Sequence, residues 1–191
     1  MNTWLTGDPH ADALLDQDPF ALVIGMLLDQ QVPMETAFAG PHRLATRMDG
    51  LDPVRIADAE PTAFAALCAE PPAVHRFPGS MAGRIQGLAR TVVDDHDGDV
   101  TRIWRDGDPD AREVLRRLKA LPGFGEQKAR IFLALLAKQR GVRPDGWRKV
   151  TGEYGEDGVH RSVADVTDAE ALAKVRATKK AAKAAARASS T

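Results

Sequence analysis

Apolar residues recur at helical spacing along almost the whole chain, and no run of alternating β-branched residues is long enough to predict a strand. The pattern therefore predicts an all-α fold. Helix starts are marked by aspartate followed by proline, because the aspartate side chain caps a helix and proline fits its first turn. Such pairs occur at Asp18-Pro19, Asp52-Pro53 and Asp108-Pro109. The first pair opens 20–32, which is apolar all round and is predicted to be a central buried helix.

The chain has 191 residues, of which 43% are hydrophobic, enough for one sizeable core. We expect one helical domain over residues 1–170, followed by a basic tail rich in alanine and lysine over 171–191. Six basic residues and no acidic residue follow Glu170, whereas six acidic residues and no lysine or arginine precede Arg43. The tail lacks apolar residues that would dock it, so we expect it to be frayed or disordered. A basic arm of this kind can still contact phosphates.

Several kinds of site are excluded by residues that the sequence lacks. The single cysteine, Cys68, cannot form an internal disulfide or a four-cysteine iron–sulfur cluster. The five histidines lack metal-ligand spacing and no nucleotide-binding glycine motif occurs, so we expect neither a metal nor a cofactor. No segment reaches the roughly 20 apolar residues of a membrane span, and the N-terminus lacks the pattern of a signal peptide. We expect a monomeric, cytoplasmic protein with no membrane partner.

Two predicted helices are joined by a tight turn at 121–125, which reads Leu-Pro-Gly-Phe-Gly. Pro122 ends the first helix, Gly123 and Gly125 allow backbone angles that other residues resist, and Phe124 can plug the joint. Such a turn exposes several backbone N–H groups at the start of the second helix. These groups can hold a phosphate oxygen without reading the base sequence. The alternative is an ordinary helical hairpin whose glycines only make the turn.

Three segments together resemble the helix-hairpin-helix DNA glycosylases, the HhH-GPD superfamily that includes endonuclease III and the alkyl-base glycosylases. The turn at 121–125 with Lys128 and Ala129 is similar to the family's hairpin pattern, Leu-Pro-Gly-hydrophobic-Gly-x-x-(Thr/Lys)-Ala. The apolar helix at 20–32 ends near a pair of glutamines, and 80–90 resembles a family helix of pattern Ser-x-x-Lys-Ala-x-x-Ile-x-x-Leu-Ala. The resemblance implies an all-α fold of two helical lobes with a cleft between them and no iron–sulfur cluster. It also implies base-excision repair of double-stranded DNA that carries a damaged base, which places the protein at the nucleoid.

The resemblance assigns DNA contacts to the turn and to the end of the apolar helix. The expected contacts are Leu121, Gly123, Phe124, Gly125, Lys128, Gln30 and Gln31. A glutamine at this helix end can fill the space that an extruded nucleotide leaves, although two adjacent amides are equally compatible with capping the helix. Gln127 and Trp147 are expected to line the base pocket. A lone aromatic residue is more often part of the core than a platform for a base, which is the alternative for Trp147.

In bifunctional members of the family, a lysine two residues after the second hairpin glycine attacks the sugar, and this position is Gln127 here. A glutamine amide is not nucleophilic and cannot form a Schiff base. Lys128 lies about 100° further around the helix, so we expect it to contact a phosphate or to be a surface charge. The resemblance therefore implies a monofunctional glycosylase, which uses a carboxylate and water.

The family's essential aspartate follows the hairpin by somewhat under twenty residues, and Asp145, eighteen residues after Gln127, fits this spacing. Its carboxylate would stay ionised next to C1′ of the sugar, stabilise the positive charge that grows as the N-glycosidic bond breaks, and orient the attacking water. The alternative is structural, because Pro144-Asp145-Gly146 is a strong turn signal. The residues after Asp145 also depart from the family pattern.

The sequence is also compatible with two other function classes. A helix-hairpin-helix protein can recognise damaged or distorted DNA without cutting it, and the glutamine at position 127 favours that alternative. A structural or regulatory helical protein with no nucleic-acid role is the second. Release of a damaged base separates the enzyme from the binding module, and salt-dependent DNA affinity separates both from the third class.

Overall fold

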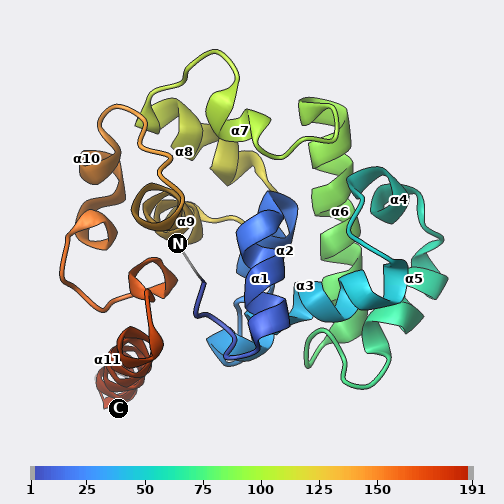
Figure 1. Cartoon of the computed structure of the whole chain (residues 1–191), viewed down its shortest axis with the longest axis horizontal. Coiled ribbons are helices and arrows are strands. Elements are labelled where there is room, and N and C mark those ends of the chain that lie inside the picture. The colour runs from blue at the N-terminus through green and yellow to red at the C-terminus, as the bar shows by residue number, and fades with distance from the viewer. Residues whose placement is uncertain (1–2, 189–191) are drawn as a thin grey trace.

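The computed structural model describes residues 3–188, and every regular element in this range is helical, which confirms the all-α prediction. In chain order the elements are α1 (Pro9–Gln17), α2 (Pro19–Leu28), α3 (Met34–Met48), α4 (Pro53–Asp58), α5 (Pro61–Ala69), α6 (Pro78–His96), α7 (Arg102–Arg105), α8 (Ala111–Ala120), α9 (Glu126–Gln139), α10 (Trp147–Thr151), the 3-10 helices η1 (Gly152–Gly155) and η2 (Val163–Asp165), and α11 (Ala169–Ala188). Figure 1 shows α4, α5 and α6 on one side of α1 and α2, and α8 to α11 on the other. A cleft between these two groups of helices stays a prediction.

Two of these three aspartate–proline pairs begin helices as expected. The Asp18 carboxylate accepts hydrogen bonds from the backbone N–H groups of Phe20 (2.8 Å) and Ala21 (3.3 Å) at the start of α2. Asp52 caps α4 in the same way. The third helix start falls slightly later, since Asp110 caps α8 by accepting from the Glu113 N–H at 2.9 Å. Local capping chemistry therefore locates the starts of α2 and α4, and it falls slightly short of the start of α8.

Helix α2 is the central element of the core, as its apolar sequence predicts. Every residue from Phe20 to Leu28 is buried. Helix α3 packs against it at very close range, because a Cβ added at Gly25 would lie 2.5 Å from the Phe38 ring. The helix ends at Leu28, earlier than the predicted 20–32, and the reason lies in the following residues. The residue before a proline disfavours helical angles, and Gln31 has a left-handed backbone with φ 57°.

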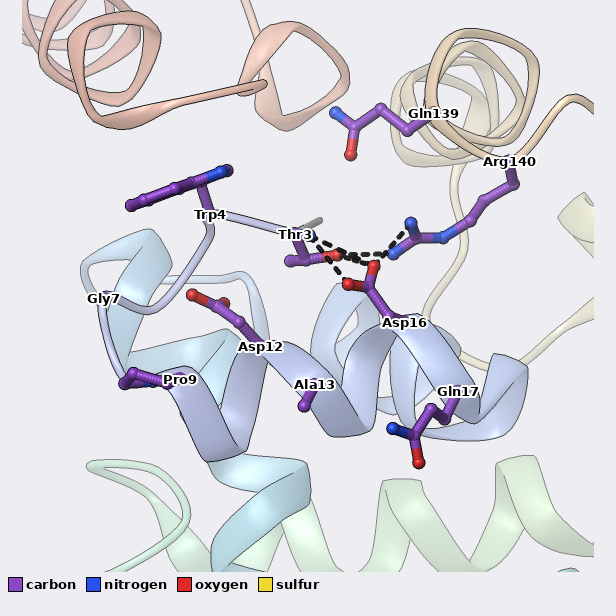
Figure 2. A pocket seen from close by; sticks show the side chains of 10 residues that line it. All are labelled: Thr3, Trp4, Gly7, Pro9, Asp12, Ala13, Asp16, Gln17, Gln139 and Arg140. Atoms are coloured by element: carbon purple, nitrogen blue, oxygen red, sulfur yellow. Dashed lines mark hydrogen bonds and ion pairs between the residues drawn. The ribbon is translucent and has the colours of Figure 1, made fainter. Parts of the chain in front are cut away.

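The N-terminal segment is fastened to the far end of α9, as Figure 2 shows. The Asp16 carboxylate accepts from the Thr3 N–H at 2.9 Å and from the Arg140 guanidinium at 2.8 Å. Arg140 also donates to the Thr3 hydroxyl at 2.7 Å. A pocket of about 720 Å³ lies beside this network, and Trp4 forms part of its wall. This network connects the first residues of the described chain to the C-terminal group of helices.

The C-terminal part of the chain is held to α9 by polar contacts. Lys138 forms an ion pair with the buried carboxylate of Asp165 at 2.6 Å. The Gln139 amide donates to backbone carbonyls of η2 and its neighbour, at 2.9 to 3.2 Å. Helix α11 follows, with only Ala171 and Val175 buried. Residues 171–188 of the predicted tail are thus helical, and their helix begins two residues before the predicted boundary at 171. The fraying of the tail stays a prediction, and residues 189–191 lie outside the described residues.

Candidate nucleic-acid interface

The hairpin turn between α8 and α9 has the geometry that its glycines predict. Gly123 has a left-handed backbone with φ 80°, and the Phe124 N–H closes the turn on the Leu121 carbonyl at 3.1 Å. Gly125 is the residue before α9, and no side chain caps this helix. The first N–H groups of α9 therefore lack a capping side chain at the surface, and they carry the positive end of the helix dipole. This is a ready site for a phosphate oxygen.

Two of the residues expected to touch DNA have buried side chains instead. Leu121 is 3% exposed and Phe124 is 4% exposed. The Phe124 ring meets the Phe132 ring edge to face at 5.9 Å, which confirms that it plugs the joint. Their contribution to the interface is therefore the shape of the turn, and any contact that the turn makes with DNA comes from its backbone.

Charged side chains surround the turn. Glu126, the first residue of α9, forms ion pairs with Lys119 from α8 and with Arg130 one turn further on, the latter at 2.8 Å. Hydrogen bonds from Lys119, then from Arg130, lower the pKa of the Glu126 carboxyl. A carboxylate in this position is favoured by the helix dipole and holds both basic groups beside the turn.

The turn packs directly on the end of α2. A Cβ added at Gly123 would lie 2.5 Å from the Leu27 side chain. The Lys128 ammonium donates to the Leu27 backbone carbonyl at 3.1 Å, so it lies against the last turn of α2 rather than on the open surface. Burial lowers the pKa of Lys128 to about 8, Asp29 opposes the shift, and Arg84 and Lys179 add to it. The half-buried Lys128 is thus a much weaker base than an ordinary lysine.

Asp29 lies at the same junction, directly after α2. Its carboxylate is 14% exposed and forms an ion pair with Lys179 of α11 at 3.5 Å. Asp29 also interacts electrostatically with Lys128, so one carboxylate interacts with lysines from two separate helices. The sequence motif around the two glutamines contained Asp29, but nothing in the sequence alone distinguished it from a solvated acid.

The two glutamines after Asp29 differ in their surroundings. Gln30 is tied into the protein: its amide donates to Leu27 at 2.8 Å, its amide oxygen accepts from Arg84 at 3.0 Å, and its backbone carbonyl bonds the His75 ring at 2.9 Å. Gln31 is exposed and lies in the left-handed region. Strained backbone of this kind is concentrated at functional sites. The capping interpretation therefore fits Gln30, and Gln31 is the glutamine that faces solvent.

The residues expected to form the base pocket are not brought together. Gln127 is exposed and its amide donates to the Tyr154 hydroxyl at 2.9 Å. Trp147 is 7% exposed, and the Arg148 guanidinium covers its ring at 4.4 Å. Trp147 lines a pocket of about 260 Å³ that also involves Lys138, near the other end of α9, and neither Gln127 nor Asp145 belongs to that pocket.

Asp145 lies at the end of the α8–α9 pair that is remote from the turn. Its backbone carbonyl accepts from the N–H of Ala111, the first residue of α8, at 3.0 Å. Helix α8 has 10 residues and is therefore about 15 Å long, and Asp145 and the turn lie at its opposite ends. The Asp145 side chain is exposed. The turn signal is confirmed, because Gly146 has φ 79° and the Trp147 N–H donates to the Pro144 carbonyl at 3.1 Å.

Comparison of the sequence with those of known proteins identifies the family to which the chain belongs. A sequence model of the HhH-GPD superfamily of base excision DNA repair proteins matches residues 24–190. The chain belongs to this superfamily. No curated protein and no solved structure gave a significant match. The family match begins in α2, includes the hairpin and continues through α11. Membership implies DNA binding and the chemistry of a base-excision repair glycosylase.

Between residues 3 and 188, no group of three or more histidine, cysteine, aspartate or glutamate side chains is placed to hold a metal ion. No helix in the same range is long and apolar enough to cross a membrane. The junction of the hairpin with α2 is thus the best-supported functional site, and Asp29, Arg84 and Lys179 are the members of it that the sequence did not single out.

Proposed function

We propose that this protein is a monofunctional DNA glycosylase that hydrolyses the N-glycosidic bond of a damaged base in double-stranded DNA. The observation that carries the proposal is the junction of the hairpin turn with the end of α2, in a chain of the HhH-GPD superfamily. This junction combines the hairpin turn, which can bind a phosphate, with the exposed Gln31 and the carboxylate of Asp29. The proposal assigns a step of the reaction to each of the three.

The turn holds the DNA by its backbone. The uncapped N–H groups at the start of α9 bind one phosphate, and Lys119 and Arg130 are close enough to exchange their partner Glu126 for phosphate oxygens. A base inside a duplex cannot reach the protein, so the nucleotide must be extruded. Gln31 then enters the vacated stack and bonds the orphaned partner base, since its side chain is exposed and lies two residues after Asp29.

Asp29 supplies the carboxylate in this proposal. It lies at the junction of the turn with α2, two residues before Gln31, and it forms an ion pair with Lys179. An ionised carboxylate near C1′ stabilises the oxocarbenium-like charge that develops as the base departs, and it can orient the attacking water. Asp145 has the spacing that the family predicts, but its place at the remote end of α8 and α9 favours the turn role.

A second candidate reaction rests on Lys128. An amine with a pKa of about 8 has a larger neutral fraction near neutral pH than an ordinary lysine, and the neutral amine can form a Schiff base with the sugar of an abasic site. This would make the protein a lyase as well, with Lys128 in place of the glutamine at position 127. The bond of its ammonium to the Leu27 carbonyl and its half-buried position favour a structural role instead.

The experiment compares base release by the wild type, Asp29→Asn and Asp145→Asn on duplexes with alkylated, deaminated or oxidised bases. Base release is followed under single-turnover conditions, and alkali cleaves the resulting abasic strand in each timed sample so that the product can be measured. DNA affinity is measured by fluorescence anisotropy. We expect Asp29→Asn to lower the rate by roughly 10² or more with DNA affinity retained, and Asp145→Asn to stay near the wild-type rate. The opposite ranking would return the catalytic role to Asp145. Binding without release of any lesion would favour the non-catalytic DNA-binding module.

Borohydride trapping distinguishes the two reactions. A monofunctional enzyme leaves an intact abasic strand that only alkali cleaves, and borohydride captures no covalent complex. A lyase forms a trapped complex that is lost in Lys128→Gln. We expect no trapped complex with the wild type, and a complex that depends on Lys128 would overturn the monofunctional assignment.

A further inference from the structure

A groove separates α11 from the loop that joins α2 to α3. It has a volume of about 1010 Å³. One wall is a face of α11, and the opposite wall is the segment from Gln31 to Thr36 together with Arg76. The hairpin does not line this groove.

The groove is strongly basic. Four bases from α11 and one from the loop before α6 line it, namely Arg176, Lys179, Lys180, Lys183 and Arg76. The only acidic residue in its lining is Glu35, which already forms an ion pair with Arg176. Positions 176, 179, 180 and 183 fall on one helix face by their spacing, so their like charges repel one another. Lys180 and Lys183 form no ion pair in the part of the chain that the structure describes.

The opposite wall adds hydrogen-bond donors. Helix α3 begins there after Pro33, and no side chain caps it. Its first backbone N–H groups, from Met34 to Thr36, belong to residues that line the groove. The positive end of the α3 dipole thus adds to the five basic side chains, and the two together favour an anion.

The lining also indicates what kind of anion fits. No aromatic residue lines the groove, so no side chain is present on which a nucleobase would stack. The groove is continuous with the proposed reaction site, because Lys179 pairs with Asp29 and Gln31 belongs to its wall. Its donors are backbone N–H groups, ammonium groups and guanidinium groups, which is the set that contacts phosphates in DNA complexes.

We propose that this groove binds the phosphodiester backbone of the DNA strand that flanks the extruded nucleotide. The inference rests on the proposed function, since it takes DNA as the substrate. It adds a second grip on the backbone, separate from the hairpin turn. The basic face of α11 thereby becomes part of the DNA-binding surface, with Lys180 and Lys183 as its free charges.

The test compares Lys180→Gln/Lys183→Gln with Lys149→Gln/Lys174→Gln. Both double variants lose two positive charges, but Lys149 and Lys174 do not line the groove, and Lys174 pairs with Glu170. The dissociation constant is measured by anisotropy between 50 and 300 mM salt, on an undamaged duplex and on one with a tetrahydrofuran abasic-site analogue. We expect the groove variant to bind DNA roughly tenfold more weakly than the wild type. Its plot of log K against log salt should also be shallower, with a slope smaller in magnitude by about 2.

Single neutral methylphosphonate linkages then locate the contact. Placed one at a time along both strands, they should weaken wild-type binding at phosphates of one strand beside the analogue, and the groove variant should be insensitive at those same positions. Equal affinities and slopes for the two double variants would overturn the inference. Base release at saturating enzyme is measured in parallel and should be unchanged in the groove variant. If the wild type releases no base, the glycosylase proposal fails. The binding data still show whether the groove contacts the DNA backbone.

Discussion

At the scale of single residues, the two glycines of the hairpin turn are needed for different reasons. Gly123 has φ 80° and abuts Leu27, so a side chain there strains the backbone and clashes. Gly125 has φ −73°, and a Cβ added to it would meet nothing within 4 Å. The protein itself therefore has room for a side chain at Gly125. In the proposed complex that room is occupied by a phosphate.

We predict that Gly125→Ala separates folding from DNA binding. Its unfolding free energy should fall by at most about 1 kcal/mol, the cost of alanine at a helix cap, whereas its DNA affinity should fall clearly because the methyl group blocks the phosphate. Gly123→Ala is the matched comparison and should lose roughly 1–3 kcal/mol of stability. Chemical denaturation and anisotropy measure the two effects. A Gly125→Ala protein that binds DNA like the wild type would remove the turn backbone from the interface.

Lys128 predicts a pH dependence of stability. Its pKa falls to about 8 in the folded protein because of burial, and it returns toward 10.5 on unfolding. Between these values the unfolded chain binds the extra proton, so stability rises with pH in this window. Wild type should gain on the order of 1 kcal/mol relative to Lys128→Met between pH 7.5 and 10, allowing for partial exposure. Urea denaturation at several pH values measures this, and parallel curves for the two proteins would show that Lys128 titrates normally.

At the scale of elements, the sequence predicts where helices start better than where they end. Asp18 and Asp52 cap helices through bonds to residues two and three positions later, so the whole signal is local. The end of α2 is set by the backbone of Gln31 and the proline at 33, and the apolar pattern continues past it. A pattern of apolar residues shows which face is buried and does not by itself mark the last turn.

In the site, too, features within one short segment were predictable, and contacts between residues far apart in the chain were not. The turn, its glycines and the plugging Phe124 were predictable because all of them lie within one short segment. The loop after α9 could not be placed from spacing alone, and it carries Asp145 to the start of α8. Asp29 gains its significance from Lys179, which is 150 residues away in the chain. Only the folded structure brings such a pair together.

At the scale of the whole molecule, α11 connects η2 to the α2–α3 region with few buried apolar residues. Ala171 and Val175 are its buried residues, and they lie in its first two turns. Beyond them, its contacts with the α2–α3 region include the ion pairs of Arg176 with Glu35 and of Lys179 with Asp29. Partly exposed ion pairs contribute little to stability and weaken in salt. The second half of α11 therefore contributes charge to the molecule more than it contributes to the core.

Removal of residues 178–191 tests this division of roles. The truncated protein keeps Ala171, Val175 and Arg176, so its unfolding free energy should stay within about 0.5 kcal/mol of the full chain. It loses Lys179, Lys180 and Lys183, so its DNA affinity should fall at least as far as that of the double lysine variant, with a shallower salt dependence. Denaturation and anisotropy on the same preparations separate the outcomes. A large loss of stability would mean that the end of α11 is part of the folded core, and the domain boundary would then lie beyond it.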